Sequence, residues 1–132
     1  MSKFVLPHFL TLMMFAVFTS FKVGYYTSVI GLGDATIQGL VTNNGYSSHN
    51  GALSNFWRSV ENIEISSSVT YAVSQASPMR GVTIQGDLRL FEGDGWSSGG
   101  FLADSTIHGN IYSGNFNFDI CRLGRTRKLV HP

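Results

Sequence analysis

The hydrophobic positions of this chain recur in short alternating runs rather than at helical spacing. Apolar side chains alternate with polar ones at Val69, Tyr71 and Val73 and again along 81–91, which is the period of a strand with one buried face. A step made of isoleucine, a variable residue and a small residue occurs four times, as Ile37-Gln38-Gly39, Ile65-Ser66-Ser67, Ile84-Gln85-Gly86 and Ile107-His108-Gly109. The isoleucines are 28, 19 and 23 residues apart, and such spacings are typical of stacked architectures.

The pattern predicts short strands joined by turns, with no helix of ten residues after residue 20. Strands are expected within the ranges 21–33, 34–41, 60–66, 69–74, 81–91 and 101–112. Sandwiches and barrels close hairpins with Asn-Gly or Asp-Gly turns, yet two of the three such dipeptides lie inside one loop over 42–54. A short strand repeated at these spacings favours a parallel β-helix instead.

The repeated step also predicts where its residues lie in a β-helix. The isoleucines are expected to point inward and stack in a column, and the glycines of the step to mark corners. The variable position then forms a polar ladder on one face, built from Gln38, Gln85 and His108.

Composition agrees with a folded, β-rich chain of one domain. The 132 residues suffice for one domain with a core but not for two. Hydrophobic residues make up 43% and charged residues 13%, which argues against a disordered chain. Four of the nine basic residues lie in the last eleven positions, as Arg122, Arg125, Arg127 and Lys128. The tail over 120–132 is therefore expected to be irregular, and no nucleic-acid partner is expected, because that needs basic residues spread over a folded face.

Residues 1–20 contain the one targeting candidate. Lys3 precedes an apolar run from Phe9 to Phe18, as in a secretory signal, although the small residues of a cleavage site are poorly placed. The alternative is a buried β-segment that caps the first coil. A membrane is expected as a partner only through an uncleaved N-terminal segment, because the run is short for a transmembrane helix. The predicted organisation is a signal-like or capping segment over 1–20, β-helix coils over 21–119 and the tail.

No metal or cofactor is expected. Cys121 is the single cysteine, so neither an internal disulfide nor a cysteine-based zinc site can form within the chain. The four histidines are scattered and lack the spacing of a zinc motif.

Four ordered blocks of the sequence resemble a known family. They read F-K-V-G-Y-Y-T-S-V-I-G-L-G (21–33), N-F-W-R-S-V-E-N-I (55–63), Y-A-V-S-Q-A-S-P-M-R (71–80) and G-W-S-S-G-G-F-L-A-D-S (95–105). In these blocks the chain is similar to secreted right-handed parallel β-helix proteins of bacteria and fungi. These proteins belong to the pectate-lyase-like superfamily, and some of them are labelled glycoside hydrolases. The resemblance implies an all-β, right-handed parallel β-helix of about four coils and an extracellular location. Because family members are several times longer, it also implies a fragment.

Carboxylates around the longest strand pattern are the candidate catalytic groups. Glycoside hydrolysis usually needs two carboxyl groups that flank the bond. Asp87, Glu92, Asp94 and Asp104 fall on two adjacent expected coils and are predicted to face one groove. Trp96 is predicted to stack on a sugar ring beside them. The alternative interpretation is a set of turn carboxylates next to a packing tryptophan.

Trp57 and Arg58 form a second candidate substrate-binding set. Arg58 offers a bidentate contact to a uronate carboxylate. It lies near Glu61 only if this stretch is a helical turn, because on a strand the two residues point to opposite faces. The alternative is Trp57 packed in the core or at a corner, with Arg58 paired locally.

Together these features predict a secreted, carbohydrate-related β-helix protein that binds or hydrolyses a cell-wall polysaccharide. If it is an enzyme, it is a glycoside hydrolase or a polysaccharide lyase. The alternative is a non-catalytic surface or structural module, or an inactive fragment of a longer β-helix protein. Open coil ends also predict self-association, because exposed β edges pair with other chains.

Overall fold

The computed structural model describes residues 20–24, 26–42, 56–92, 100–113, 119–125 and 128–130. The predicted site residues Asp94 and Trp96 and residues 1–19 of the N-terminal segment lie outside the described residues. The described part consists of strands and turns, and it contains no helix that is long and apolar enough to span a membrane. The prediction of an all-β chain is therefore confirmed for these residues.

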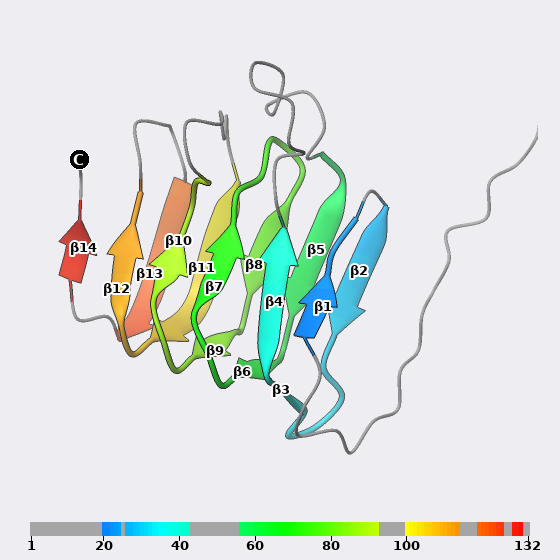
Figure 1. Ribbon diagram of the computed structural model, residues 1–132, viewed down its shortest axis with the longest axis horizontal. Helices are drawn as coiled ribbons and strands as arrows, with labels where there is room; N and C mark the ends of the chain where they lie inside the picture. Colours follow the sequence, from blue (N-terminus) through cyan, green and yellow to red (C-terminus); the bar gives the residue numbers. More distant parts are fainter. Residues whose placement is uncertain are drawn as a thin grey trace, which may run out of the picture.

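The strands form two parallel sheets that the chain visits alternately (Figure 1). The first sheet has the order β1 (Ser20–Lys22), β4 (Gly39–Thr42), β7 (Val69–Tyr71), β10 (Leu88–Arg89), β12 (Asn110–Tyr112) and β14 (Lys128–Val130). The second has the order β2 (Thr27–Ile30), β5 (Arg58–Glu61), β8 (Pro78–Arg80), β11 (Phe101–Ile107), β9 (Thr83–Ile84), β6 (Glu64–Ile65) and β3 (Thr36–Ile37), with β13 (Asp119–Arg125) also paired to β11. We call one passage of the chain through both sheets a coil. Each strand lies parallel to its counterpart in the next coil, which is consistent with a β-helix.

The predicted isoleucine column is confirmed by the strand register. Ile37 pairs with Ile65, Ile65 with Ile84, and Ile84 with Ile107. All four side chains are buried in one hydrophobic core between the sheets. The unequal spacings of 28, 19 and 23 residues thus bring equivalent positions of successive coils together.

Small residues after these isoleucines let neighbouring coils approach closely. A Cβ added at Gly86 would lie 2.6 Å from the backbone nitrogen of Ser68, and one at Gly109 would lie 2.5 Å from the Gly86 carbonyl oxygen. The middle residue of each step also joins neighbouring coils. The backbone N–H groups of Ser66, Gln85 and His108 each donate to the isoleucine carbonyl oxygen of the preceding coil, at 2.9 Å. Their side chains are exposed, as is that of Gln38, so the predicted polar positions align on one face.

The second sheet bends between its two rows of strands. β11 runs through the bend, because its first residues pair with β8 and its last residues pair with β9. Asn62, Gly81 and Asp104 occupy the bend with φ values of 52°, 62° and 49°, in the left-handed region that asparagine, aspartate and glycine tolerate best. The N–H groups of Gly31, Asn62 and Gly81 each donate to a carbonyl of the following coil, at 2.8, 3.1 and 3.1 Å. We call Gly31, Asn62, Gly81 and Asp104 the bend column.

The basic tail differs from its prediction. The expected irregular segment contains β13 in part and β14 in full, and these strands lie parallel to β11 and β12. The reason is that the outer edges of β11 and β12 carry backbone N–H and C=O groups that another strand satisfies. Pairing of this kind uses the backbone, so a basic side-chain composition does not prevent it.

Candidate functional site

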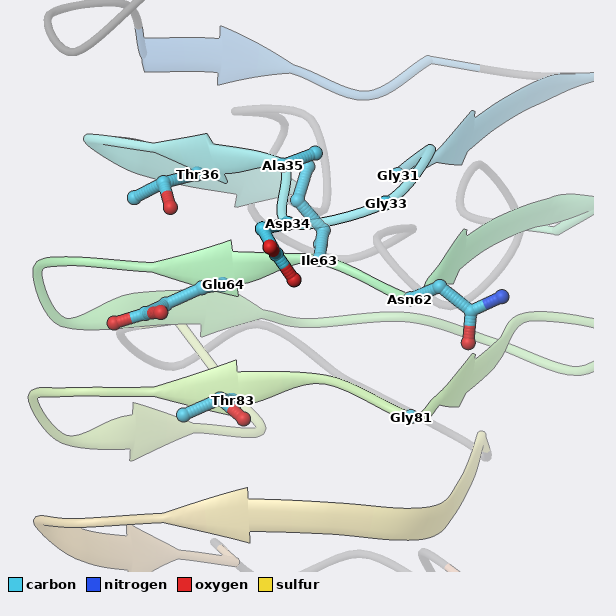
Figure 2. Close-up of a pocket in the computed structure, with 10 residues that line it drawn as sticks. All are labelled: Gly31, Gly33, Asp34, Ala35, Thr36, Asn62, Ile63, Glu64, Gly81 and Thr83. Carbon is cyan, nitrogen blue, oxygen red and sulfur yellow. The ribbon is translucent and has the colours of Figure 1, made fainter.

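An open groove follows the bend of the second sheet (Figure 2). Its volume is about 600 Å³. Three members of the bend column line it, together with residues of β3, β6 and β9 and of the turns before them. The lining residues are Gly31, Gly33, Asp34, Ala35, Thr36, Asn62, Ile63, Glu64, Gly81 and Thr83.

The glycines at the start of the groove set the path of its wall. A Cβ at Gly31 would overlap the carbonyl group of Asn62, so only glycine lets the chain pass this close to the next coil. Gly33 has a φ of 67°, which side chains other than glycine rarely adopt. The turn that these residues make carries Asp34 to the edge of the groove.

Asp34 and Glu64 supply the carboxylates that line the groove. Glu64 begins β6 and pairs in register with Thr36 of β3 and Thr83 of β9, so a threonine lies on each side of it. Its Oε1 accepts a hydrogen bond from Gln85 Nε2 at 2.6 Å, which orients the carboxylate. Asp34 is exposed, and its side chain projects from the turn before β3 toward the segment that carries Glu64 (Figure 2).

This arrangement suits a ligand rich in hydroxyl groups. Carboxylates accept hydrogen bonds from such a ligand, and the flanking threonine hydroxyls both donate and accept. Glycoside hydrolysis usually uses two carboxyl groups, and Asp34 and Glu64 supply two on adjacent coils of the groove lining. Within the described residues, no group of three or more His, Cys, Asp or Glu side chains is able to hold a metal ion.

The structure places the described predicted carboxylates, Asp87, Glu92 and Asp104, at different positions along the coils. Asp87 lies between β9 and β10, and its Oδ1 accepts a hydrogen bond from the backbone N–H of Asn110 at 2.8 Å. This carboxylate therefore holds the turn that leads into β12. Glu92 is half-buried after β10, and Asp104 is exposed in the bend column, one coil beyond Gly81. Of the described predicted carboxylates, Asp104 alone continues a column that lines the groove.

Trp57 and Arg58 are adjacent in sequence but point in opposite directions. The Trp57 side chain is 57% exposed and stacks on Tyr26, with ring centroids 6.4 Å apart and an angle of 18° between the planes. Arg58 is 5% exposed, and its Nη1 donates to the Val23 carbonyl oxygen at 2.7 Å. Arg58 shares the inward face of β5 with buried Val60. The structure thus directs this guanidinium to the interior, which agrees with the alternative interpretation of a locally paired Arg58.

Asp34 and Glu64 were not among the residues that sequence reasoning selected. The signal that identifies them is the isoleucine step itself. Thr36, Glu64 and Thr83 directly precede the stacked isoleucines, so aligning the steps would have placed Glu64 between two hydroxyl groups.

Comparison with known proteins shows one informative similarity. The chain is 42% identical over 98 residues to an exo-beta-1,3-glucanase of Streptomyces sp. (strain SirexAA-E / ActE). The aligned part covers 68% of this chain and 16% of that protein, so the chain spans about a sixth of the length of this relative. No family model matches the chain, and no solved structure gives a significant match. Membership of the pectate-lyase-like superfamily therefore stays a prediction.

Proposed function

We propose that the chain is part of a secreted, carbohydrate-active right-handed parallel β-helix that binds and hydrolyses a β-1,3-glucan. The observation that carries this proposal is the 42% identity, over 98 residues, to a protein named as an exo-beta-1,3-glucanase. The parallel sheets and the groove with its two carboxylates support it. The groove is the proposed substrate site, and its open form suits an extended polymer.

Asp34 and Glu64 are the proposed acid–base pair. One carboxyl group donates a proton to the glycosidic oxygen as the bond to the anomeric carbon breaks. The other activates the water that attacks this carbon, or attacks it directly before water releases the sugar. Glu64 is fixed by Gln85 and flanked by Thr36 and Thr83, which are placed to bind sugar hydroxyls. Asp104 of the bend column is a further candidate, because it continues the bend beyond Gly81.

Measurement of reducing ends released from a soluble β-1,3-glucan tests the proposal. Replacing a catalytic carboxylate removes proton transfer, so Asp34→Asn and Glu64→Gln are each expected to lower the rate by about 100-fold or more. Glu61→Gln is the matched control, because Glu61 lies on β5 outside the groove lining and should leave the rate unchanged. Equal rates in all three variants would contradict the assignment of the pair.

The second candidate function is a non-catalytic glucan-binding module. The observation that favours it is the structural use of Asp87, whose carboxylate accepts a hydrogen bond from the backbone of the next coil. Binding of the glucan without new reducing ends would support this alternative over hydrolysis.

A further inference from the structure

Two exposed aromatic side chains lie side by side away from the groove. Tyr26 immediately precedes β2 and Trp57 immediately precedes β5, and their side chains are 69% and 57% exposed. The rings stack at 6.4 Å, and the Tyr26 N–H donates to the Trp57 carbonyl oxygen at 2.7 Å. Neighbouring coils therefore present two stacked, exposed aromatic rings at one corner, which we call the aromatic pair.

The backbone under the aromatic pair is strained. Tyr26 and Trp57 have φ values of 52° and 55°, a region in which bulky side chains are outliers and glycine or asparagine is favoured. Ala76 has a φ of 56° at the equivalent corner of the next coil, where Arg58 donates its backbone N–H to the Ala76 carbonyl at 3.3 Å. The corner thus requires this conformation but no aromatic ring. Folding does not account for large, solvent-exposed rings at strained positions, and such outliers occur preferentially at binding sites.

Two neutral hydroxyl groups lie on the strands that begin directly after the aromatic pair. Ser28 and Ser59 follow the two aromatic residues by two positions, and their exposed hydroxyl groups are hydrogen-bonded to each other at 2.9 Å. The adjacent cation, Arg58, is buried and bound to the Val23 carbonyl oxygen. Exposed aromatic rings next to a few hydroxyl groups suit a sugar ring, which has an apolar face and a rim of hydroxyl groups. The buried guanidinium argues against an acidic sugar as the ligand.

We infer that Tyr26 and Trp57 form a surface binding site for a ring of a neutral polysaccharide, with Ser28 and Ser59 as its hydrogen-bonding partners. The site is separate from the groove, because the two lie at opposite ends of β2 and β5. Five residue steps from Tyr26 to Gly31 correspond to about 16 Å of extended chain. The choice of β-1,3-glucan as ligand rests on the proposed function, whereas the site itself rests on the geometry of the aromatic pair.

Titration calorimetry with a soluble β-1,3-glucan tests this inference. Trp57→Asn is the informative variant, because asparagine tolerates the left-handed corner and the fold should keep or increase its melting temperature. We expect Trp57→Asn to weaken binding by at least about tenfold, and Tyr26→Asn to weaken it less. Val41→Ala is the matched control, because Val41 is an exposed apolar residue on β4 of the other sheet and should leave the affinity unchanged.

The outcomes separate this inference from the proposed hydrolysis. Unchanged affinity in a folded Trp57→Asn variant, or tighter binding of polygalacturonate than of the neutral glucan, overturns the aromatic site. If the unmodified chain releases no reducing ends but Trp57→Asn still weakens binding, the aromatic site is supported and the proposed hydrolysis is contradicted. No binding of any neutral polysaccharide by the unmodified chain overturns the site as well.

Discussion

Replacing one isoleucine of the column tests how the coils are held together. Ile84 is fully buried and pairs in register with Ile65 on one side and Ile107 on the other. Changing it to alanine removes three carbon groups, which is about 2.4 kcal/mol of transfer free energy at about 0.8 kcal/mol each. The cavity between two rigidly paired neighbours adds to this cost, so we expect Ile84→Ala to lower the free energy of unfolding by about 3–4 kcal/mol.

Ile30→Ala is the matched control for this prediction. Ile30 ends β2 and is 48% exposed, so the same chemical change should cost about 1 kcal/mol or less. Urea unfolding followed by the strand signal in circular dichroism measures both values. For a chain of this length the difference corresponds to a melting temperature lower by roughly 10 °C for Ile84→Ala than for Ile30→Ala. Equal losses in the two variants would refute the stacked column as the source of stability.

Two further predictions concern the backbone and a buried hydroxyl group. Gly31→Ala should destabilise the chain by about 2 kcal/mol because its Cβ would overlap the Asn62 carbonyl, whereas Gly24→Ala, whose Cβ would have its nearest neighbour at 3.9 Å, should be nearly neutral in the same unfolding assay. Burial raises the pKa of the Tyr71 hydroxyl well above its usual value near 10, and Arg58 lowers it by a smaller amount. The folded chain then keeps a proton that the unfolded chain releases above about pH 10, so stability should fall as pH rises past 10, and less so in Tyr71→Phe. Urea midpoints at pH 8 and pH 11 measure this difference, and the same pH dependence in both proteins would contradict it.

The core of the fold could be predicted from sequence because one residue type marks it. Each coil places an isoleucine inward and a small residue after it because of local packing. The positions of these isoleucines in the sequence therefore give the register between the strands of successive coils. The strands of the tail could not be predicted in this way. β13 and β14 form because β11 and β12 offer open backbone edges, which is a property of distant residues and not of the basic tail itself.

The site was harder to predict because the sequence does not show directly which alternate residues of each short strand point inward. The sequence left two interpretations of Arg58 open, a contact to a ligand and local pairing. Arg58 shares a face with Val60, and the period of two along β5 places both inside. Glu64 stands in a strand of two residues, which is too short for alternation to show its direction. Its position became clear only once the coils were aligned through the isoleucines.

Incubation of the purified chain with a soluble β-1,3-glucan, followed by quantification of both bound polymer and released reducing ends, tests the central claim most directly. We predict saturable binding and product release that Glu64→Gln abolishes and Glu61→Gln does not. A chain that neither binds the glucan nor releases reducing ends from it would contradict the account.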